Sequence, residues 1–437
     1  MGSRMGLTSS LKANAAAWLT SGTLRSLKRT KVELGRRLHG RDHEILYFHR
    51  ADDPYCQLMV QILPEFAKRF KVKIKPVVVE RLPANMYPDP QRYEAYAIID
   101  AARLARLYGL GFPSDALVPD ALSAGMVNRY LASQQGNADF FPMAEEVGSA
   151  LWRRAVGKIK ETCDIARVKD ISLRGNEKKL RSLGHYASAS LYYGGEWYAG
   201  LDRLDHLEER LNKQGLGSDN EIQTGLSRLW RFNLASMGPR AQGKVVELFF
   251  SMRSPYSYLA LEQLSHLCTE VGATLKLRPV LPMVMRGMQV PPQKKYYILT
   301  DAKREAEAAD LPFGKMVDPL GKATENALKI GCYLAEEDPG KVAIFYRTFM
   351  RCVVAKGIDG ASDSGLATIC EKAGVHPANV REAMADQSWR DVVENNRQEM
   401  FAMGCWGVPS IRCGDTVVWG QDRIWAIVDA LKGESEH

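Results

Sequence analysis

The sequence predicts an α/β protein with two tandem domains of one plan, each interrupted by a helical insertion. Residues 245–250 form an almost wholly apolar run, which a polar loop and Pro255 follow at the start of a helical period. Residues 44–54 run in the same way from an apolar stretch into a proline. Gly-x-Asp-Arg occurs at 200–203 and again at 420–423, roughly 200 residues later. A buried strand and a proline-started helix, repeated at such an offset, indicate an internal duplication.

The 437 residues are too many for one ordinary domain, and the local patterns divide them into four parts. We expect a basic arm over 1–40, a first domain over 41–215 and a linker helix over 216–243. The second domain spans 244–437, with its helical insertion at about 283–396. The arm holds eight Lys or Arg against one acid. It is predicted to be a surface helix or a partly ordered arm on its own domain, with an amphipathic membrane-surface helix as the less favoured alternative.

Composition excludes several classes of function. The chain is 46% hydrophobic and 25% charged, with a net charge of +8, and it has no basic stripe interleaved with aromatic residues. Nucleic-acid binding is therefore not expected. No apolar run is long enough to span a bilayer. The eight cysteines lie scattered in apolar segments without a Cys-x-x-Cys pair, which favours a reduced, cytoplasmic protein. We expect no metal site.

Ser254 is the first candidate for a functional residue. It lies directly before Pro255, at the predicted N-cap of the helix that follows the buried strand. A hydroxyl at this place lies at the positive end of the helix dipole, beside backbone N–H groups, and such a position stabilises an anion. A purely structural N-cap is the alternative, because serine is a favoured cap residue.

A second motif lies near the C-terminus and contains Pro409. Gly-Val-Pro is followed by two strand-like runs, 410–413 and 416–419, joined by a Gly-Asp turn. Trp-Gly-Gln-Asp-Arg then leads into a closing helix. Together with Ser-Pro-Tyr-Ser-Tyr-Leu at 254–259, this order resembles the DsbA-like branch of the thioredoxin superfamily. More closely, residues 244–432 resemble the kappa-class glutathione transferases and 2-hydroxychromene-2-carboxylate isomerases.

The resemblance implies a binding site for glutathione. A cis Val408–Pro409 bond would present the backbone of Val408 to the cysteine of glutathione, and Gln421 and Asp422 would bind its γ-glutamyl end. Ser254 would hold the glutathione sulfur as a thiolate, since a hydroxyl donor at a helix N-terminus lowers the pKa of a thiol. Gln289 stands where the family has an asparagine that contacts glutathione. Possible groups on the substrate side are Tyr256, Arg286, Lys294, Tyr296 and Tyr297.

The first domain has different residues at the corresponding positions. Asp53 stands where Ser254 stands, Ala189 where Pro409 stands and Leu201 where Gln421 stands. A carboxylate would repel a thiolate, so we interpret this domain as a structural partner with a degenerate site. Cys56 is predicted to be a packing residue rather than a redox residue.

Taken together, the sequence favours a glutathione-dependent isomerase or transferase that acts on a conjugated or electrophilic small molecule. A homodimer is possible on this interpretation. The alternative is a non-catalytic binding or scaffold protein of the DsbA family, since a fold does not determine a function. A thiol–disulfide oxidoreductase is the least favoured interpretation, because disulfide exchange needs an attacking and a resolving thiol.

Overall fold

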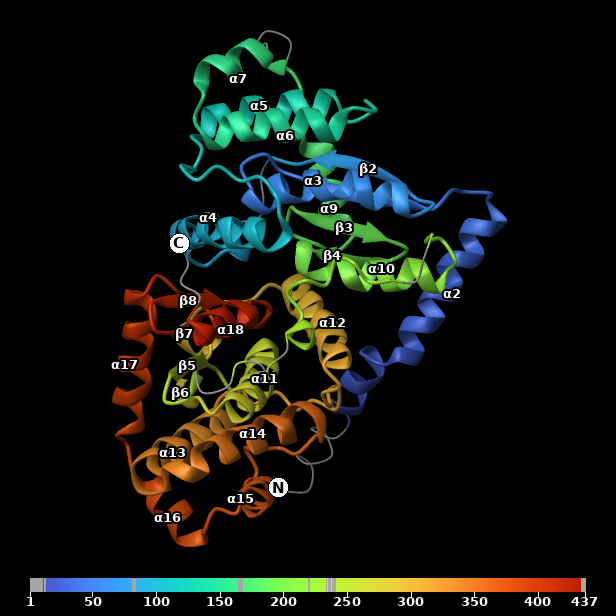
Figure 1. The fold of residues 1–437 in the computed structure, drawn as a ribbon. Coiled ribbons are helices and arrows are strands. Elements are labelled where there is room, and N and C mark those ends of the chain that lie inside the picture. The colour runs from blue at the N-terminus through green and yellow to red at the C-terminus, as the bar shows by residue number, and fades with distance from the viewer. Residues whose placement is uncertain are drawn as a thin grey trace. The chain divides into compact units, whose positions relative to one another are not determined.

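The computed structural model describes residues 11–433, apart from residues 12, 81–83, 164–167, 219–220, 233, 235–236 and 238–240. The chain forms two compact units (Figure 1). The N-terminal unit is Ser26–Ser227, and the C-terminal unit joins Met1–Arg25 to Arg228–His437. Within the described residues, no helix has both the length and the apolar character needed to cross a membrane.

The C-terminal unit is built on a four-stranded sheet in the order β6-β5-β7-β8. β5 pairs in parallel with β6 and antiparallel with β7, and β7 forms a hairpin with β8. Its strands are β5 (Val245–Phe250), β6 (Thr274–Pro279), β7 (Ser410–Cys413) and β8 (Thr416–Trp419). The parallel crossover is α11 (Pro255–Val271), and the hairpin is closed by η6 (Gln421–Arg423) and α18 (Ile424–Lys432). This is the thioredoxin order that the sequence predicts.

The expected helical insertion lies between β6 and β7. After η5 (Met283–Arg286) it contains α12 (Pro292–Ala308), α13 (Lys322–Glu337), α14 (Pro339–Ala355), α15 (Asp363–Ala373), α16 (Pro377–Ala385) and α17 (Trp389–Ala402). β5 is central in the sheet and is fully buried apart from its first residue. Phe249 packs with Met400 of α17 and with Cys405, whereas Phe250 meets the ring of Tyr346 on α14. The apolar strand therefore anchors the sheet on both faces.

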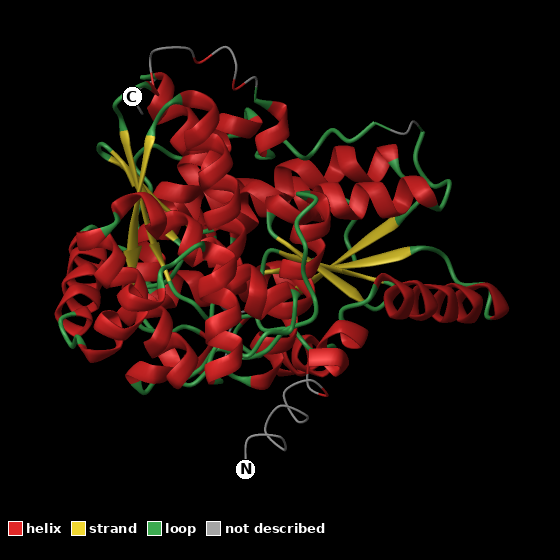
Figure 2. Ribbon diagram, turned by 90° about the horizontal axis from the view of Figure 1, so that it is seen from below, coloured by secondary structure: helices red, strands yellow, loops and turns green. Residues whose placement is uncertain are grey.

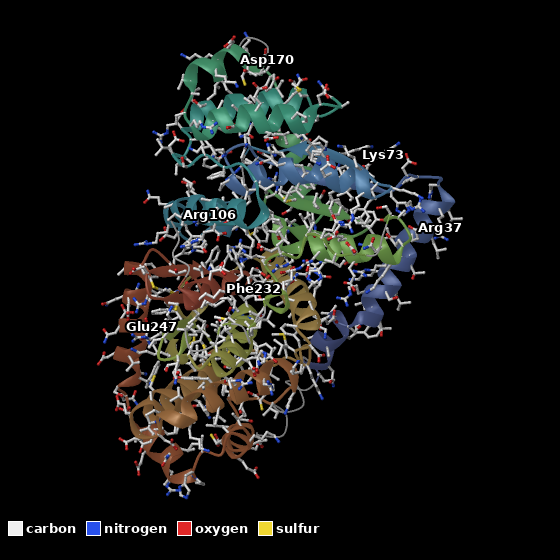
Figure 3. The ribbon with its side chains drawn as sticks, in the orientation of Figure 1. Arg37, Lys73, Arg106, Asp170, Phe232 and Glu247 are labelled. Atoms are coloured by element: carbon white, nitrogen blue, oxygen red, sulfur yellow. The ribbon has the colours of Figure 1, made fainter. Side chains whose placement is uncertain are left out.

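Charged side chains at the sheet are paired with one another. Glu247 on β5, labelled in Figure 3, accepts from Arg278 on β6 at 2.7 Å and from Arg412 on β7 at 2.6 Å. These two guanidiniums lower the pKa of the Glu247 carboxyl against the effect of its burial. The pairs lock the register of three neighbouring strands.

The N-terminal unit repeats the same topology. Its sheet has the order β2-β1-β3-β4, with β1 parallel to β2 and antiparallel to β3. The strands are β1 (Glu44–His49), β2 (Lys73–Val78), β3 (Ser190–Tyr193) and β4 (Glu196–Ala199). Figure 2 shows each sheet as its own twisted fan of strands. The fold class predicted from the sequence, two thioredoxin-like domains each with a helical insertion, is confirmed.

Helices complete the N-terminal unit. The crossover is α3 (Pro54–Arg69), and the insertion between β2 and β3 contains η1 (Ala84–Met86), α4 (Pro90–Tyr108), α5 (Ala121–Ser133), α6 (Phe140–Trp152), α7 (Val156–Thr162) and α9 (Arg174–Ser182). η2 (Leu201–Arg203) and α10 (Leu204–Lys213) close the hairpin. α2 (Gly22–Leu38) covers the second half of the basic arm and buries none of its residues completely.

The segment 216–243 differs from the linker helix that we expected. Among its described residues no α-helix forms; the 3-10 helix η3 (Leu229–Arg231) and single residues of 3-10 conformation at Leu234, Met237 and Ala241 are present instead. Polar residues and the Gly-rich start of this segment favour hydrogen bonds to side chains over a continuous helix. Thr224, for example, donates its backbone N–H and its hydroxyl to Glu208 of α10.

Candidate active site

Ser254 caps α11, as the sequence predicts. Its backbone is extended, with φ −87° and ψ 115°, and its Oγ accepts the N–H of Ser257 at 3.1 Å. Pro255 occupies the first helical position, where its missing N–H has no cost. Because Oγ accepts from the helix, the hydroxyl proton of Ser254 points elsewhere and is available to a second acceptor. The residue is half-buried.

The loop before β7 faces this hydroxyl. The Ser254 Oγ lies 3.5 Å from the carbonyl oxygen of Val408, at the limit for a hydrogen bond. The Val408–Pro409 peptide bond is cis, as expected. Among the described residues, the N–H of Val408 has no hydrogen-bond partner. Val408 is half-buried, so an unused donor and a weakly engaged carbonyl lie together beside Ser254.

The side chain of Gln421 is buried and hydrogen-bonded to its own domain. It is only 5% exposed, and its amide is directed into the domain. Its Oε1 accepts from Gln263 of α11 at 3.1 Å, and its Nε2 donates to Glu305 of α12 at 3.1 Å. The same Nε2 also donates to the carboxylate of Asp422. Gln421 therefore ties three helical elements together, while the neighbouring Asp422 is half-buried.

The remaining candidates are spread along η5, α12 and the loop between them. Gln289 is exposed in this loop, and within the described residues no hydrogen bond links it to Ser254 or Val408. The hydroxyl of Tyr256 donates to the buried Asp301 of α12 at 2.7 Å. Desolvation lowers the pKa of the half-buried Lys294 to about 8 and also lowers the pKa of Arg286. Tyr296 is 49% exposed.

Comparison with known proteins finds a family model that matches the part of the chain holding these residues. A model of the DsbA-like thioredoxin domain matches residues 245–432, the region that holds the sheet, the insertion and both loops of the site.

Residues 245–432 are a DsbA-like thioredoxin domain.

Curated relatives match this chain over about the length of the DsbA-like domain. The chain is 24% identical over 198 residues to the 2-hydroxychromene-2-carboxylate isomerase of Pseudomonas putida, covering 43% of this chain and 94% of the relative. It is 27% identical over 206 residues to glutathione S-transferase kappa 1 of Rattus norvegicus, covering 43% of this chain and 90% of the relative. A solved structure of a 2-hydroxychromene-2-carboxylate isomerase aligns with a TM-score of 0.37 and 21% identity, covering 43% of this chain and 94% of that one.

In the N-terminal unit, a model of the F plasmid transfer operon protein matches residues 28–98.

The N-terminal unit has the same pair of loops, with different chemistry. Asp53 caps α3 and receives the hydroxyl of Ser188 at 2.5 Å, the counterpart of the Ser254–Val408 contact in the DsbA-like domain. Both Asp53 and Ser188 are 5% exposed, and burial raises the pKa of the Asp53 carboxyl. Ala189, in the place of Pro409, adopts a φ of +51°. Here a direct side-chain hydrogen bond joins the two loops, whereas Ser254 and Val408 of the C-terminal unit are half-buried and in long contact.

Cys56 is a packing residue in this unit, as predicted. It is fully buried, and its Sγ accepts the N–H of Arg50 at 3.3 Å and of Ala189 at 3.2 Å. Burial raises the pKa of its thiol well above the ordinary value. Ser257 holds the corresponding place in the DsbA-like domain, where its Oγ accepts the N–H of Ser251 at 3.3 Å.

Sequence reasoning missed the buried charges around the DsbA-like site. Glu305 is 2% exposed and accepts from Arg228 at 2.5 Å, so the amide of Gln421 meets a carboxylate already paired with a cation. One signal was present in the sequence. The hydroxyl of Tyr55 donates to Asp100, and the hydroxyl of Tyr256 donates to Asp301. In both units the acceptor lies 45 residues after the tyrosine. That shared spacing marks the Tyr–Asp pair as part of the common plan.

Proposed function

We propose that the DsbA-like domain is a glutathione-dependent isomerase or transferase that acts on a conjugated or electrophilic small molecule. The observation that carries the proposal is the meeting of the Ser254 hydroxyl with the backbone of Val408, whose N–H has no partner within the described residues. The similarity of this domain to an isomerase and to a kappa-class glutathione transferase supports the same assignment.

The residues present fit glutathione. An extended peptide binds by pairing its backbone with an unused N–H and C=O, and Val408 offers both. The Asp422 carboxylate, at the start of η6, is suited to the ammonium of a γ-glutamyl group. We retain Gln289 as a contact of the proposed site. Gln421 supports the site through its hydrogen bonds to Gln263 and Glu305 rather than through a free amide.

When bound, glutathione would supply a thiol whose ionised form is the nucleophile. The task of the protein is then to stabilise negative charge at the start of α11. Ser254 can donate its proton to an anion, because its Oγ already accepts from Ser257 and its contact with Val408 is long. The unpaired N–H groups in the first turn of α11 add the positive end of the helix dipole. Both effects lower the pKa of a thiol placed there.

No cysteine of the chain takes part in this proposal. All eight are buried, and neither Ser254 nor Ser257 is a cysteine, so the DsbA-like domain has no thiol at the start of α11. Disulfide exchange would need an accessible thiolate. A binding protein without activity remains the competing function. It differs from an enzyme in that it would convert no acceptor.

The test is calorimetry with glutathione followed by a turnover screen with conjugated aromatic acids and halogenated acceptors. The enzyme assignment predicts that glutathione binds and that at least one class of acceptor is converted. Binding without turnover across the screen would favour the non-catalytic alternative. Absence of glutathione binding would overturn the proposal.

A further inference from the structure

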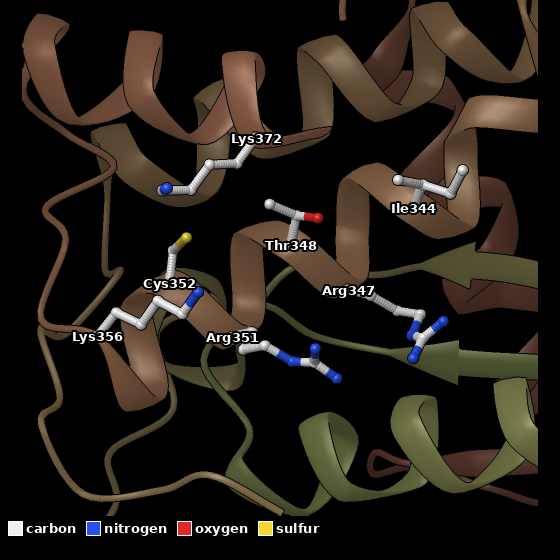
Figure 4. Close-up of a pocket in the computed structure, with 7 residues that line it drawn as sticks. All are labelled: Ile344, Arg347, Thr348, Arg351, Cys352, Lys356 and Lys372. Carbon is white, nitrogen blue, oxygen red and sulfur yellow. The ribbon is translucent and has the colours of Figure 1, made fainter. Parts of the chain in front are cut away.

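Four of the seven residues that line a cavity in the helical insertion of the DsbA-like domain are cations. The cavity has a volume of about 370 Å³ and lies along α14 and the end of α15. Figure 4 shows its lining residues, which are Ile344, Arg347, Thr348, Arg351, Cys352, Lys356 and Lys372. None of them is a carboxylate. The volume is that of a small-molecule site.

One buried carboxylate holds the two guanidiniums of the cavity. Glu262 of α11 is 3% exposed and accepts from Arg347 at 2.9 Å and from Arg351 at 2.7 Å. The side chains of Arg347 and Arg351 remain 38% and 37% exposed. A single carboxylate balances only one of two guanidiniums, and it also fixes both planar groups at the wall. They are therefore pre-oriented for an oxyanion.

The two lysines add charge that the protein does not balance. Lys356 and Lys372 are exposed, and within the described part of the chain neither forms an ion pair. Figure 4 draws their amino groups on either side of Cys352. The charges of Lys356, Lys372 and Arg351 act to lower the pKa of the buried Cys352 thiol, against the larger effect of its desolvation. The lining of the cavity thus holds four cations, of which the two guanidiniums contact the Glu262 carboxylate.

We propose that this cavity binds a small oxyanion with at least two negative charges, such as a phosphorylated or polycarboxylate metabolite. Two guanidiniums and two ammonium groups match the several oxygens of such a ligand, and the Thr348 hydroxyl supplies a neutral donor. The site is separate from the proposed glutathione site, because Glu262 lies eight residues along α11 from Ser254, roughly 12 Å along the helix axis. The inference does not depend on the proposed enzymatic activity.

The experiment is isothermal titration calorimetry of the full chain with pyrophosphate and, in a second arm, with citrate. The double variant Lys356→Gln/Lys372→Gln removes two cavity charges at exposed positions. Its matched control, Lys178→Gln/Lys179→Gln on the exposed surface of α9, changes the net charge equally. We expect the cavity variant to weaken pyrophosphate binding at least tenfold and the control to change it less than twofold. Lys356→Arg/Lys372→Arg, which keeps the charges, should retain binding.

The two arms identify the chemical source of the oxyanion. Tighter binding of pyrophosphate assigns the site to phosphorylated ligands, and tighter binding of citrate assigns it to polycarboxylates. Three results would overturn the proposal: no heat with either probe, equal weakening in the cavity variant and its control, or affinity that does not fall as salt rises.

Discussion

The Oγ of Ser254 lies 3.5 Å from the carbonyl oxygen of Val408, while the corresponding Asp53 of the N-terminal unit is joined to Ser188 at 2.5 Å. The first pair is half-buried and the second is buried. A long contact leaves room for a ligand atom to accept the serine proton, whereas a short hydrogen bond to a carboxylate does not. The difference between these two pairs underlies the assignment of the proposed site to the C-terminal unit alone.

Replacement of Ser254 separates its capping role from its proposed chemical role. Ser254→Ala removes a helix cap, which costs about 1 kcal/mol of stability, and also the donor to the thiolate. We expect turnover to fall more than tenfold and the pKa of bound glutathione to rise, as followed by thiolate absorbance against pH. Ser362, which caps α15 by accepting the N–H of Gly365, provides the matched control. Ser362→Ala should lose similar stability with activity unchanged, and equal losses of activity would contradict the role of Ser254.

The buried amide of Gln421 should resist the introduction of charge. Its Nε2 lies 3.1 Å from the carboxylate of Glu305, so Gln421→Glu places two carboxyl groups against each other where the wild type has a hydrogen bond. We expect a loss of more than about 2 kcal/mol in the free energy of unfolding, measured with urea. Gln289→Glu makes the same chemical change at an exposed position and should cost less than about 0.5 kcal/mol. Similar losses of unfolding free energy in the two variants would show that the Gln421 amide is not buried against Glu305.

Cys56 should be dispensable for activity and inert toward thiol reagents. Burial raises the pKa of its thiol, so little thiolate is present near neutral pH. We expect Cys56→Ala to change glutathione-dependent turnover less than twofold, although loss of the acceptor for the N–H of Ala189 will lower stability. Mass spectrometry of the native chain after alkylation at pH 7.5 should find Cys56 unmodified. A large loss of turnover in the folded variant would reopen the thiol-exchange alternative.

Lys294 should titrate below other lysines. Desolvation disfavours its charged form and lowers its pKa from 10.5 to about 8. The pKa of Lys294 is lower in the folded state than in the unfolded state. Its contribution to stability therefore rises with pH from about 8 to 10.5, and it is lost as pH falls through the folded-state pKa of about 8. Amine labelling followed by peptide mapping should give a midpoint near pH 8 for Lys294. Lys294→Met should remove that part of the pH dependence of stability, and a labelling midpoint above pH 10 would exclude the effect.

Local patterns predicted much of the fold. The apolar run of β5, the proline at the start of α11 and the Gly-Asp turn between β7 and β8 are each encoded within a few residues, so they could be identified without distant contacts. The described residues of 216–243 do not form the α-helix that we expected, and Gln223 and Thr224 among them donate to Glu208 of α10, a partner that no local pattern reveals. The inward orientation of Gln421 escaped prediction for the same reason, since Glu305 is more than 100 residues away.

Local sequence patterns suffice to predict the chain order of the strands, the cap position of Ser254 and the presence of two units of one plan. These follow from periodicity, from the fixed φ of proline and from the short side chain of serine, which act over a turn or less of chain. Which polar groups meet depends on the three-dimensional packing: Ser254 with Val408, Gln421 with Glu305, and Arg347 and Arg351 with Glu262. Such pairs depend on packing between distant helices and loops, because the energy of a charge or a hydrogen bond is set by the groups that burial brings around it.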